Sequence, residues 1–494
     1  MPSRIPPRGA AAAALLAAAG EAAAHGFGRL YNLPVPFWLY GWAAASVLVL
    51  SFLLVGFFAS TPAATDATQA RERDLTDSRF GRTLRRLRPT LRWFAVGLLL
   101  LCIATGFFGN RDPYRNFSMT FFWVVFTLGG TYLAALVGDA YGPLNPWRAL
   151  TDGVGRLWRG YRRGQVRYPE KLGDLPALAF YLVFIWFELF GHSKPASLAA
   201  MLTIYTAVNL AGVWLVGTAA WFRHCEFFAL FLRLLGHMAP LELRPPEQPG
   251  ERSRVSLRWP FGGLLTTRPG RASTVLFALA MLATTAFDGL RATQWWVGLF
   301  WRDPSGLVTA FAGGPPIQAY AGLRPWYIAW ETLWLLLAPL LYGLAYLACI
   351  ALAWLLTGRR RPLRALTLDF GYTLLPIAVV YHLTHYSTLL LTQGLKIVSL
   401  VSDPFGRGWN LFGTARMLRA PILPDMGLVW HTQVGLILFG HVVSVYVAHR
   451  IALRVFPNRG LALASQLPML ALMIAFTVAG LWILAQPLTA ELMR

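Results

Sequence analysis

The strongest constraint on this chain is a series of apolar segments, each long enough to cross a lipid bilayer. A membrane-spanning helix needs about 20 mostly apolar residues. Of the 494 residues, 56% are hydrophobic and only 13% are charged, whereas soluble domains carry about 25% charged residues. We therefore predict an all-α fold, a polytopic membrane helix bundle with about ten transmembrane helices after an N-terminal signal segment. The predicted spans are Pro36–Ala59, Trp93–Phe108, Phe117–Val137, Pro176–Phe190, Leu198–Phe222, Ser273–Trp296, Tyr327–Leu356, Asp369–Leu391, Gly427–Ala448 and Leu461–Ala485.

The charge of the chain indicates how these spans are oriented. The formal net charge is +22, and almost all of the excess is arginine. The arginines gather in alternate connections, at residues 71–88, 156–167, 244–268, 359–364 and 450–459. Short cytoplasmic loops of membrane proteins are enriched in Lys and Arg, so we predict that these connections are cytoplasmic. The mature N-terminus and the C-terminus then both lie outside, and the same pattern speaks against nucleic acid as the partner of the basic residues.

The N-terminal residues have the features of a secretory signal peptide. A basic start with Arg4 and Arg8 is followed by the apolar stretch Ala10–Ala19 and by small residues at 22–24. Cleavage there would remove residues 1–24 and make His25 the new N-terminus. The alternative is an alanine-rich arm that is not cleaved.

Residues 25–494 are predicted to form a single integral membrane domain without a soluble catalytic domain. The largest basic connection is a loop near residues 223–271. Within it, His224–Leu235 has the pattern of an amphipathic helix that lies on the cytoplasmic membrane surface.

Ionisable residues inside the spans are the strongest functional signal. His382 and His385 are three residues apart in an apolar run, so they share one helix face. The predicted orientation places Asp288, Glu331 and His431 in the outer halves or at the outer ends of their spans as well. Such residues are costly in a bilayer and usually face a partner, a cavity or a ligand. Glu188 falls at the outer end of its span, and His441 falls near mid-membrane.

These residues allow several kinds of site. His25, His382, His385 and His431 are the candidate ligands of a divalent metal such as Zn or Cu. Histidines on facing helices also ligate b-type haem without a sequence motif, and His441 is the candidate partner of His382 for this cofactor. A lone intramembrane histidine can equally be a hydrogen-bonded packing residue.

Several common catalytic signatures are missing. The chain has no P-loop, GxSxG elbow, HExxH motif or glycine-rich dinucleotide loop. Its three cysteines, Cys102, Cys225 and Cys349, do not form a CxxC or CxxCH pattern, which speaks against a thiolate zinc site and covalently attached haem.

Several short motifs resemble those of a known family. They are HGFG at residues 25–28, NPWR at 145–148, YHLTHY at 381–386, SDPFG at 402–406 and QLPML at 466–470. With them, the chain is similar over most of its length to bacterial multi-pass membrane proteins labelled fenitrothion hydrolase. The resemblance implies a location in the bacterial inner (plasma) membrane. It also implies metal-assisted hydrolysis of an apolar organophosphorothioate ester.

Three functional hypotheses follow. In a metal-dependent hydrolase, the metal would activate a water molecule and Asp288 or Glu331 would be the general base. In a copper- or haem-binding redox or metal-handling protein, the histidines would be ligands, and the protein could be a subunit of a larger membrane complex. In a proton-coupled transporter, the histidines and carboxylates would relay protons. The sequence leaves these three open.

Overall fold

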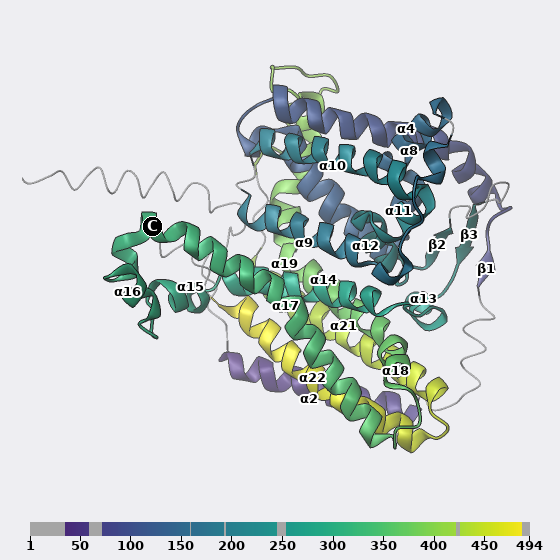
Figure 1. The fold of residues 1–494 in the computed structure, drawn as a ribbon, viewed down its shortest axis with the longest axis vertical. Coiled ribbons are helices and arrows are strands. Elements are labelled where there is room, and N and C mark those ends of the chain that lie inside the picture. The colour runs from purple at the N-terminus through teal and green to yellow at the C-terminus, as the bar shows by residue number, and fades with distance from the viewer. Residues whose placement is uncertain are drawn as a thin grey trace, which may run out of the picture.

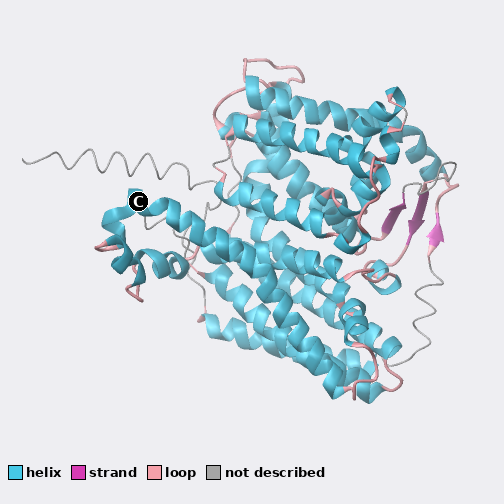
Figure 2. Cartoon of the chain, in the orientation of Figure 1, coloured by secondary structure: helices cyan, strands magenta, loops and turns pink. Residues whose placement is uncertain are grey.

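The computed structural model describes residues 35–58, 72–158, 160–191, 194–244, 253–420 and 425–486. In this part of the chain the fold is an all-α polytopic helix bundle with one small sheet (Figure 1, Figure 2). The predicted signal segment, residues 1–24, and His25 lie outside the described residues.

Nine segments of the described chain are long and apolar enough to cross a membrane. They are α2 (Phe37–Phe58), α4 (Arg79–Phe108), α5–η3–α6 (Phe117–Met119, Thr120–Gly129, Gly130–Leu136), α10 (Pro195–Val216), α14 (Ala272–Arg291), η6–α17 (Pro316–Ala319, Tyr320–Leu356), α18–η7–α19–η8–α20 (Leu363–Asp369, Gly371–Leu374, Leu375–Gln393, Gly394–Lys396, Ile397–Ser402), α21 (Met426–Val455) and α22 (Arg459–Ala485). The remaining predicted span, Pro176–Phe190, corresponds to α9 (Leu175–Phe190), an apolar helix of 16 residues. These helices are consistent with an integral membrane protein.

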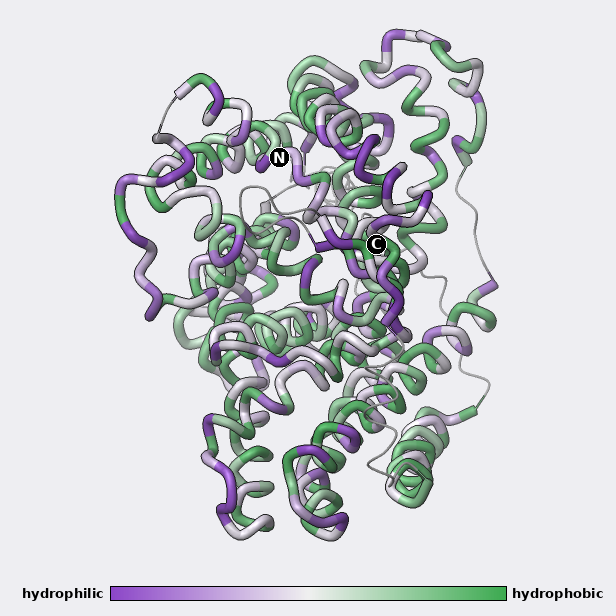
Figure 3. Tube along the Cα trace, turned by 90° about the vertical axis from the view of Figure 1, so that its right-hand side faces the viewer, coloured by the Kyte–Doolittle hydropathy of each residue, from purple (hydrophilic) through white to green (hydrophobic). Residues whose placement is uncertain are grey.

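Shorter elements connect the long helices. The connecting helices are η2 (Pro113–Arg115), α7 (Tyr141–Leu144), α8 (Pro146–Leu157), η4 (Tyr161–Arg163), η5 (Glu170–Leu172), α11 (Thr218–His224), α12 (Phe227–Gly236), α13 (Gly262–Thr266), α15 (Gln294–Trp301) and α16 (Leu307–Ala312). Figure 3 shows hydrophobic stretches along the helices and hydrophilic residues gathered mainly in the connections.

The centre of the bundle is formed by α14 and α19. In an 18-residue apolar stretch of each span that contains them, 78% of the residues are buried. In the same kind of stretch of α4, α10 or α22, only 28% of the residues are buried. α14 packs against α17 and α19, and α19 packs against α21. The outer helices therefore carry apolar side chains on faces that the protein does not cover, as expected for helices in contact with lipid tails.

The starts of the helices agree with their local sequences. Ser78 precedes α4 and accepts a hydrogen bond from the Gly81 N–H at 3.1 Å. Asn145 of the NPWR motif accepts one from the Arg148 N–H at 3.0 Å and is followed by proline at the first position of α8. Side-chain oxygen atoms at these positions satisfy amide groups that the helix itself leaves without a partner. The motif therefore acts as a helix start.

One small sheet stands at the arginine-rich end of the bundle, at the right of Figure 1. Its antiparallel strands are β1 (Arg73–Asp74), β2 (Leu241–Arg244) and β3 (Arg254–Leu257), in the order β1-β3-β2. The sequence did not predict it, because β1 contributes only two residues and pairs with β3, about 180 positions further along the chain. α15 and α16 lie at the opposite end of the bundle.

The predicted surface helix at His224–Leu235 differs from the structure. The segment is divided between α11 and α12, and nine of the ten residues of α12 are buried. α12 packs against α6, α9 and α19 inside the bundle. The physical reason is its composition: the sequence FFALFLRLLG contains one charged residue, so it has no polar face to present to water.

Candidate functional site

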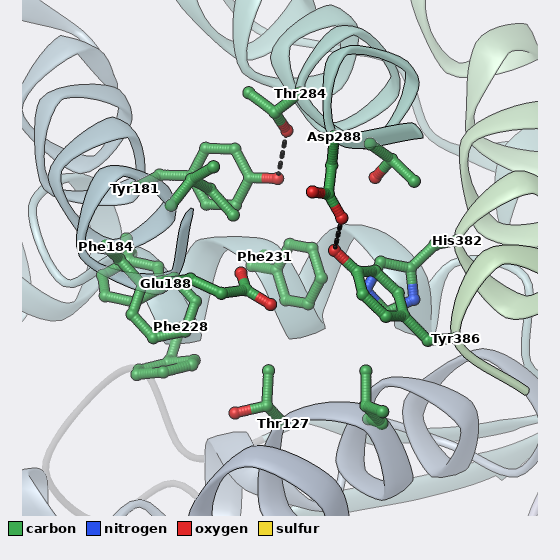
Figure 4. A pocket seen from close by; sticks show the side chains of 14 residues that line it. Thr127, Tyr181, Phe184, Glu188, Phe228, Phe231, Thr284, Asp288, His382 and Tyr386 are labelled. Atoms are coloured by element: carbon green, nitrogen blue, oxygen red, sulfur yellow. Dashed lines mark hydrogen bonds between the residues drawn. The ribbon is translucent and has the colours of Figure 1, made fainter. Parts of the chain in front are cut away.

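A pocket with both polar and apolar lining residues opens between five helices at the centre of the bundle. Its walls come from η3, α9, α12, α14 and α19, and it encloses about 480 Å³ of space between the surrounding atoms, including its opening. The side chains break this space up, so that it offers room for about one or two water molecules. The pocket is lined by Thr127, Leu128, Tyr181, Phe184, Ile185, Glu188, Phe227, Phe228, Phe231, Thr284, Thr285, Asp288, His382 and Tyr386 (Figure 4).

Asp288 is the centre of the polar contacts in this pocket. It lies in the last turn of α14 and is 5% exposed. The Tyr386 hydroxyl donates to Asp288 Oδ2 at 2.8 Å, and His385 Nε2 lies 2.9 Å from the same oxygen (Figure 4 draws the first bond). Arg291 NH1 lies 4.0 Å from Oδ1. Because these three groups surround the carboxylate, its negative charge can be held at a depth where an isolated charge would be costly.

The spacing of the residues on α19 explains this arrangement. His382, His385 and Tyr386 are three and four positions apart and so lie on one side of the helix. His385 contacts Asp288 from outside the pocket lining, while His382 and Tyr386 face the pocket itself. The imidazole and the phenol therefore approach the same carboxylate from two directions.

Glu188 and His382 face the pocket from opposite walls. The Glu188 side chain extends from α9 into the space in front of Asp288 and Tyr386 (Figure 4). His382 lies on α19, and its Nδ1 is buried without a hydrogen-bond partner within the described residues. Buried polar atoms of native proteins nearly always have a partner, which can be an ordered water molecule. Because His382 lines the pocket, its Nδ1 can form a hydrogen bond with a small molecule there, such as water.

The wall opposite α14 is a ten-residue π-helix, η3. Here the Thr127 hydroxyl donates to the carbonyl oxygen of Phe122, five residues earlier, at 2.9 Å. π-helical segments are rare and often occur at functional sites. The wider turn places Thr127 on the pocket, and the hydroxyl groups of Tyr181 and Thr284 meet at 2.9 Å on the far side (Figure 4).

Glu331 does not line the pocket, although the sequence grouped it with Asp288. Its carboxylate pairs with the Arg291 guanidinium through two contacts, Nε–Oε1 at 3.2 Å and NH2–Oε2 at 3.1 Å. The guanidinium group also lies over the Phe190 ring, 4.8 Å from its centroid. Arg291 therefore connects Glu331 to Asp288, and Glu331 acts on the pocket through this arginine.

His441 belongs to a second cavity. It lies on α21 and faces a space of about 390 Å³ that Tyr381 and Tyr342 also line. His441 Nδ1 lies 2.7 Å from the Ile437 carbonyl oxygen, and its Nε2 is buried without a partner among the described residues. His382 lines the other cavity. The two histidines proposed for haem thus do not share a site, and the geometry does not fit that cofactor.

His431 is also separated from the central pocket. It is exposed near the start of α21, with Nδ1 2.7 Å from the Gly427 carbonyl oxygen and its ring beside Tyr40. Within the described residues, no group of three or more His, Cys, Asp or Glu side chains could hold a metal ion. The predicted metal site is not assembled by the described histidines, and a site that includes His25 stays a prediction.

Two important side chains of the site were not predicted from the sequence. Tyr386 directly follows His385 in the YHLTHY motif, so its place beside the histidines was a signal that could have been used. Arg291 ends α14 three residues after Asp288, and it resembled an ordinary interfacial arginine.

Comparison with known proteins adds no assignment. No family model, no curated protein and no solved structure matches this chain. The resemblance to proteins labelled fenitrothion hydrolase therefore stays an expectation, and the functional argument rests on the pocket.

Proposed function

We propose that this protein translocates protons, and that the central pocket is part of the proton path. The observation that carries the proposal is the contact of 2.9 Å between His385 Nε2 and Asp288 Oδ2, beside a buried pocket that also contains Glu188 and His382. Chains of carboxylates and histidines inside membrane helices are the usual means of proton transfer in pumps and transporters.

The groups are close enough for proton exchange. A proton shared between His385 and Asp288 can move along the 2.9 Å contact, and the Tyr386 hydroxyl holds the same carboxylate oxygen at 2.8 Å. Proton transfer requires a separation of this kind or one bridging water molecule. Water molecules in the pocket would connect Asp288 with Glu188 on the opposite wall and with His382.

The size of the pocket supports protons and water as its occupants. Drug-sized ligands occupy open clefts of several hundred Å³, whereas bulky side chains such as Phe184, Phe228 and Phe231 divide this space into small gaps. An apolar ester would require these rings to move. A proton requires no such movement.

The test is proton flux in proteoliposomes that contain the full-length protein and an internal pH-sensitive dye. A potassium diffusion potential drives protons, and the rate is compared for wild type, Asp288→Asn and Asp112→Asn. Asparagine preserves the size of residue 288 and removes the titratable group. Asp112 is the matched control because its side chain is 43% exposed near the start of η2, away from the pocket.

We expect flux above that of protein-free liposomes in the wild type and in Asp112→Asn. Asp288→Asn should lower it by at least about tenfold, the scale of losing a positioned proton-transfer group. Equal flux in wild type and Asp288→Asn, or no flux in the wild type, would overturn the proposal. Size-exclusion profiles of each variant establish that it is folded.

A second candidate is the hydrolase that the family resemblance implies. The contact with Asp288 fixes one nitrogen of His385, which would leave Nδ1 to accept a proton from a water molecule that attacks phosphorus. The bond from phosphorus to the aryl oxygen would break, and the aryloxide would leave. This proposal predicts release of nitrophenolate from fenitrothion by purified wild type and its loss in His385→Gln. No release by the wild type would leave proton translocation as the only proposal.

A further inference from the structure

A further cavity lies at the arginine-rich end of the bundle, beside the first half of α4. It encloses about 470 Å³ between the first turns of α4, the segment around α7 and the strands β2 and β3. Its lining residues are Leu84, Arg85, Arg88, Ala140, Pro143, Leu144, Leu243, Arg244, Ser253, Arg254 and Val255. Four of these eleven residues are arginines, and none is acidic.

The accessible walls of this cavity are apolar. Leu84, Leu144, Leu243 and Val255 give apolar walls. The arginine side chains add their aliphatic stems to these walls and carry their charged groups at the ends. A cavity of this kind suits a molecule that is apolar at one end and negatively charged at the other.

Among the described residues, the hydrogen bonds that hold Arg88 in place are accepted by neutral groups. Its Nε donates to the Pro143 carbonyl oxygen at 3.4 Å, and its NH1 donates to the Ser253 hydroxyl at 3.0 Å. Both acceptors are neutral, so these two contacts orient the guanidinium group without neutralising its charge. An anion at the cavity could neutralise that charge.

Two other arginines are positioned by acidic residues that stand outside the lining. Arg244 NH2 lies 2.9 Å from Glu242 Oε1, and Arg85 NH2 lies 3.4 Å from Asp77 Oδ1. Burial would raise the pKa of Glu242, but Arg258 and Arg244 outweigh it and lower the pKa. Glu242 therefore stays ionised, and it fixes the strand that carries Arg244.

The depth of the cavity matches the head-group layer of a membrane. Arg88 precedes Trp93 by five residues on α4, and the apolar half of α4 begins at Trp93. At 1.5 Å per residue, the two lie about 7 Å apart along the helix axis. Trp93 is 50% exposed, as is typical of tryptophan at the membrane interface.

We propose that this cavity binds the phosphate head group of an anionic amphiphile. Arg85, Arg88, Arg244 and Arg254 contact the phosphate, and the apolar walls receive the part of the molecule next to it. A phospholipid of the leaflet that we predict to be cytoplasmic has this chemistry, and basic pockets on that side commonly bind such lipids. Free phosphate has the same charge but no apolar part. The proposal is independent of proton translocation.

The experiment uses the full-length protein in detergent and measures binding of three probes by thermophoresis. The probes are short-chain phosphatidylglycerol, short-chain phosphatidylcholine and inorganic phosphate. The pocket variant is Arg88→Gln with Arg254→Gln. The matched control is Arg79→Gln with Arg86→Gln, which removes the same charge from two exposed positions of α4 outside the cavity lining.

We expect wild type to bind phosphatidylglycerol at least about tenfold more tightly than either other probe. The pocket variant should lose at least about tenfold in affinity, and the control should stay within about twofold. Equal binding of inorganic phosphate would overturn the lipid as the source. Equal losses in the pocket variant and the control, or no binding by wild type, would overturn the site. Proton flux is also measured for the Arg88→Gln with Arg254→Gln variant, so that a loss of lipid binding is distinguished from a failure of the central pocket.

Discussion

Breaking the ion pair between Arg291 and Glu331 should destabilise the protein unequally, depending on which partner is removed. Glu331 and Asp288 are almost completely buried, with side chains that are 2% and 7% exposed. Replacing Arg291 by methionine would leave two buried carboxylates without their shared cation. Replacing Glu331 by glutamine would leave Arg291 with Asp288, 4.0 Å away.

The distances give the scale of the effect. At an effective dielectric constant of 20, two unit charges 3.1 Å apart attract by about 5 kcal/mol, and charges 4.0 Å apart by about 4 kcal/mol. Desolvation offsets much of this attraction, so the net value of the intact pair is small, but removal of one partner typically costs about 3–5 kcal/mol. We expect Arg291→Met to reach this range. Glu331→Gln should cost about 1–3 kcal/mol because Asp288 remains as a partner for the arginine.

The assay is a double-mutant cycle on the free energy of unfolding, measured by denaturation with sodium dodecyl sulfate in mixed micelles. The double variant Arg291→Met with Glu331→Gln removes both charges of the pair and should be more stable than Arg291→Met alone. The cycle should give a coupling energy above about 1 kcal/mol, as contacting residues do. Additive single effects, or equal costs for Arg291→Met and Glu331→Gln, would refute the reasoning.

Three further predictions concern stability. Burial and neighbouring arginines lower the pKa of His237, which lies outside the spans, to about 3. Below pH 6.5 the unfolded state therefore binds more protons than the folded state, so the temperature of thermal unfolding should fall between pH 7 and pH 5. His237→Gln should reduce that fall. A side chain at Gly440 would clash with Val380, whereas Gly435 on the same helix has open space. Gly440→Ala should therefore cost about 1–3 kcal/mol in detergent denaturation, and Gly435→Ala should not. Asn145→Ala removes the N-cap of α8 and the hydrogen bond of 3.1 Å from Asn145 Nδ2 to the buried Glu226 carboxylate, and should cost about 2–4 kcal/mol in the same assay.

The central pocket could be anticipated only in part. The spacing of His382 and His385 and the intramembrane position of Asp288 indicated a polar site. Depth alone did not distinguish His385, which contacts Asp288, from His431, which is exposed near the start of α21. Whether a histidine is buried or exposed depends on which face of its helix packs against a neighbouring helix. The sequence of one helix does not specify that packing.

The sequence by itself determined the class of the fold and most of its long helices, because the length of an apolar run and the residues that cap it act locally. Within a span, the helix satisfies its own backbone hydrogen bonds, so each can be recognised without its neighbours. The tertiary structure decided the rest. It brought Asp288 to His385, 97 positions away, it paired β1 with β3, and it buried α12. These contacts arise from the packing of particular helix faces, and a periodic pattern in one segment does not encode its partner.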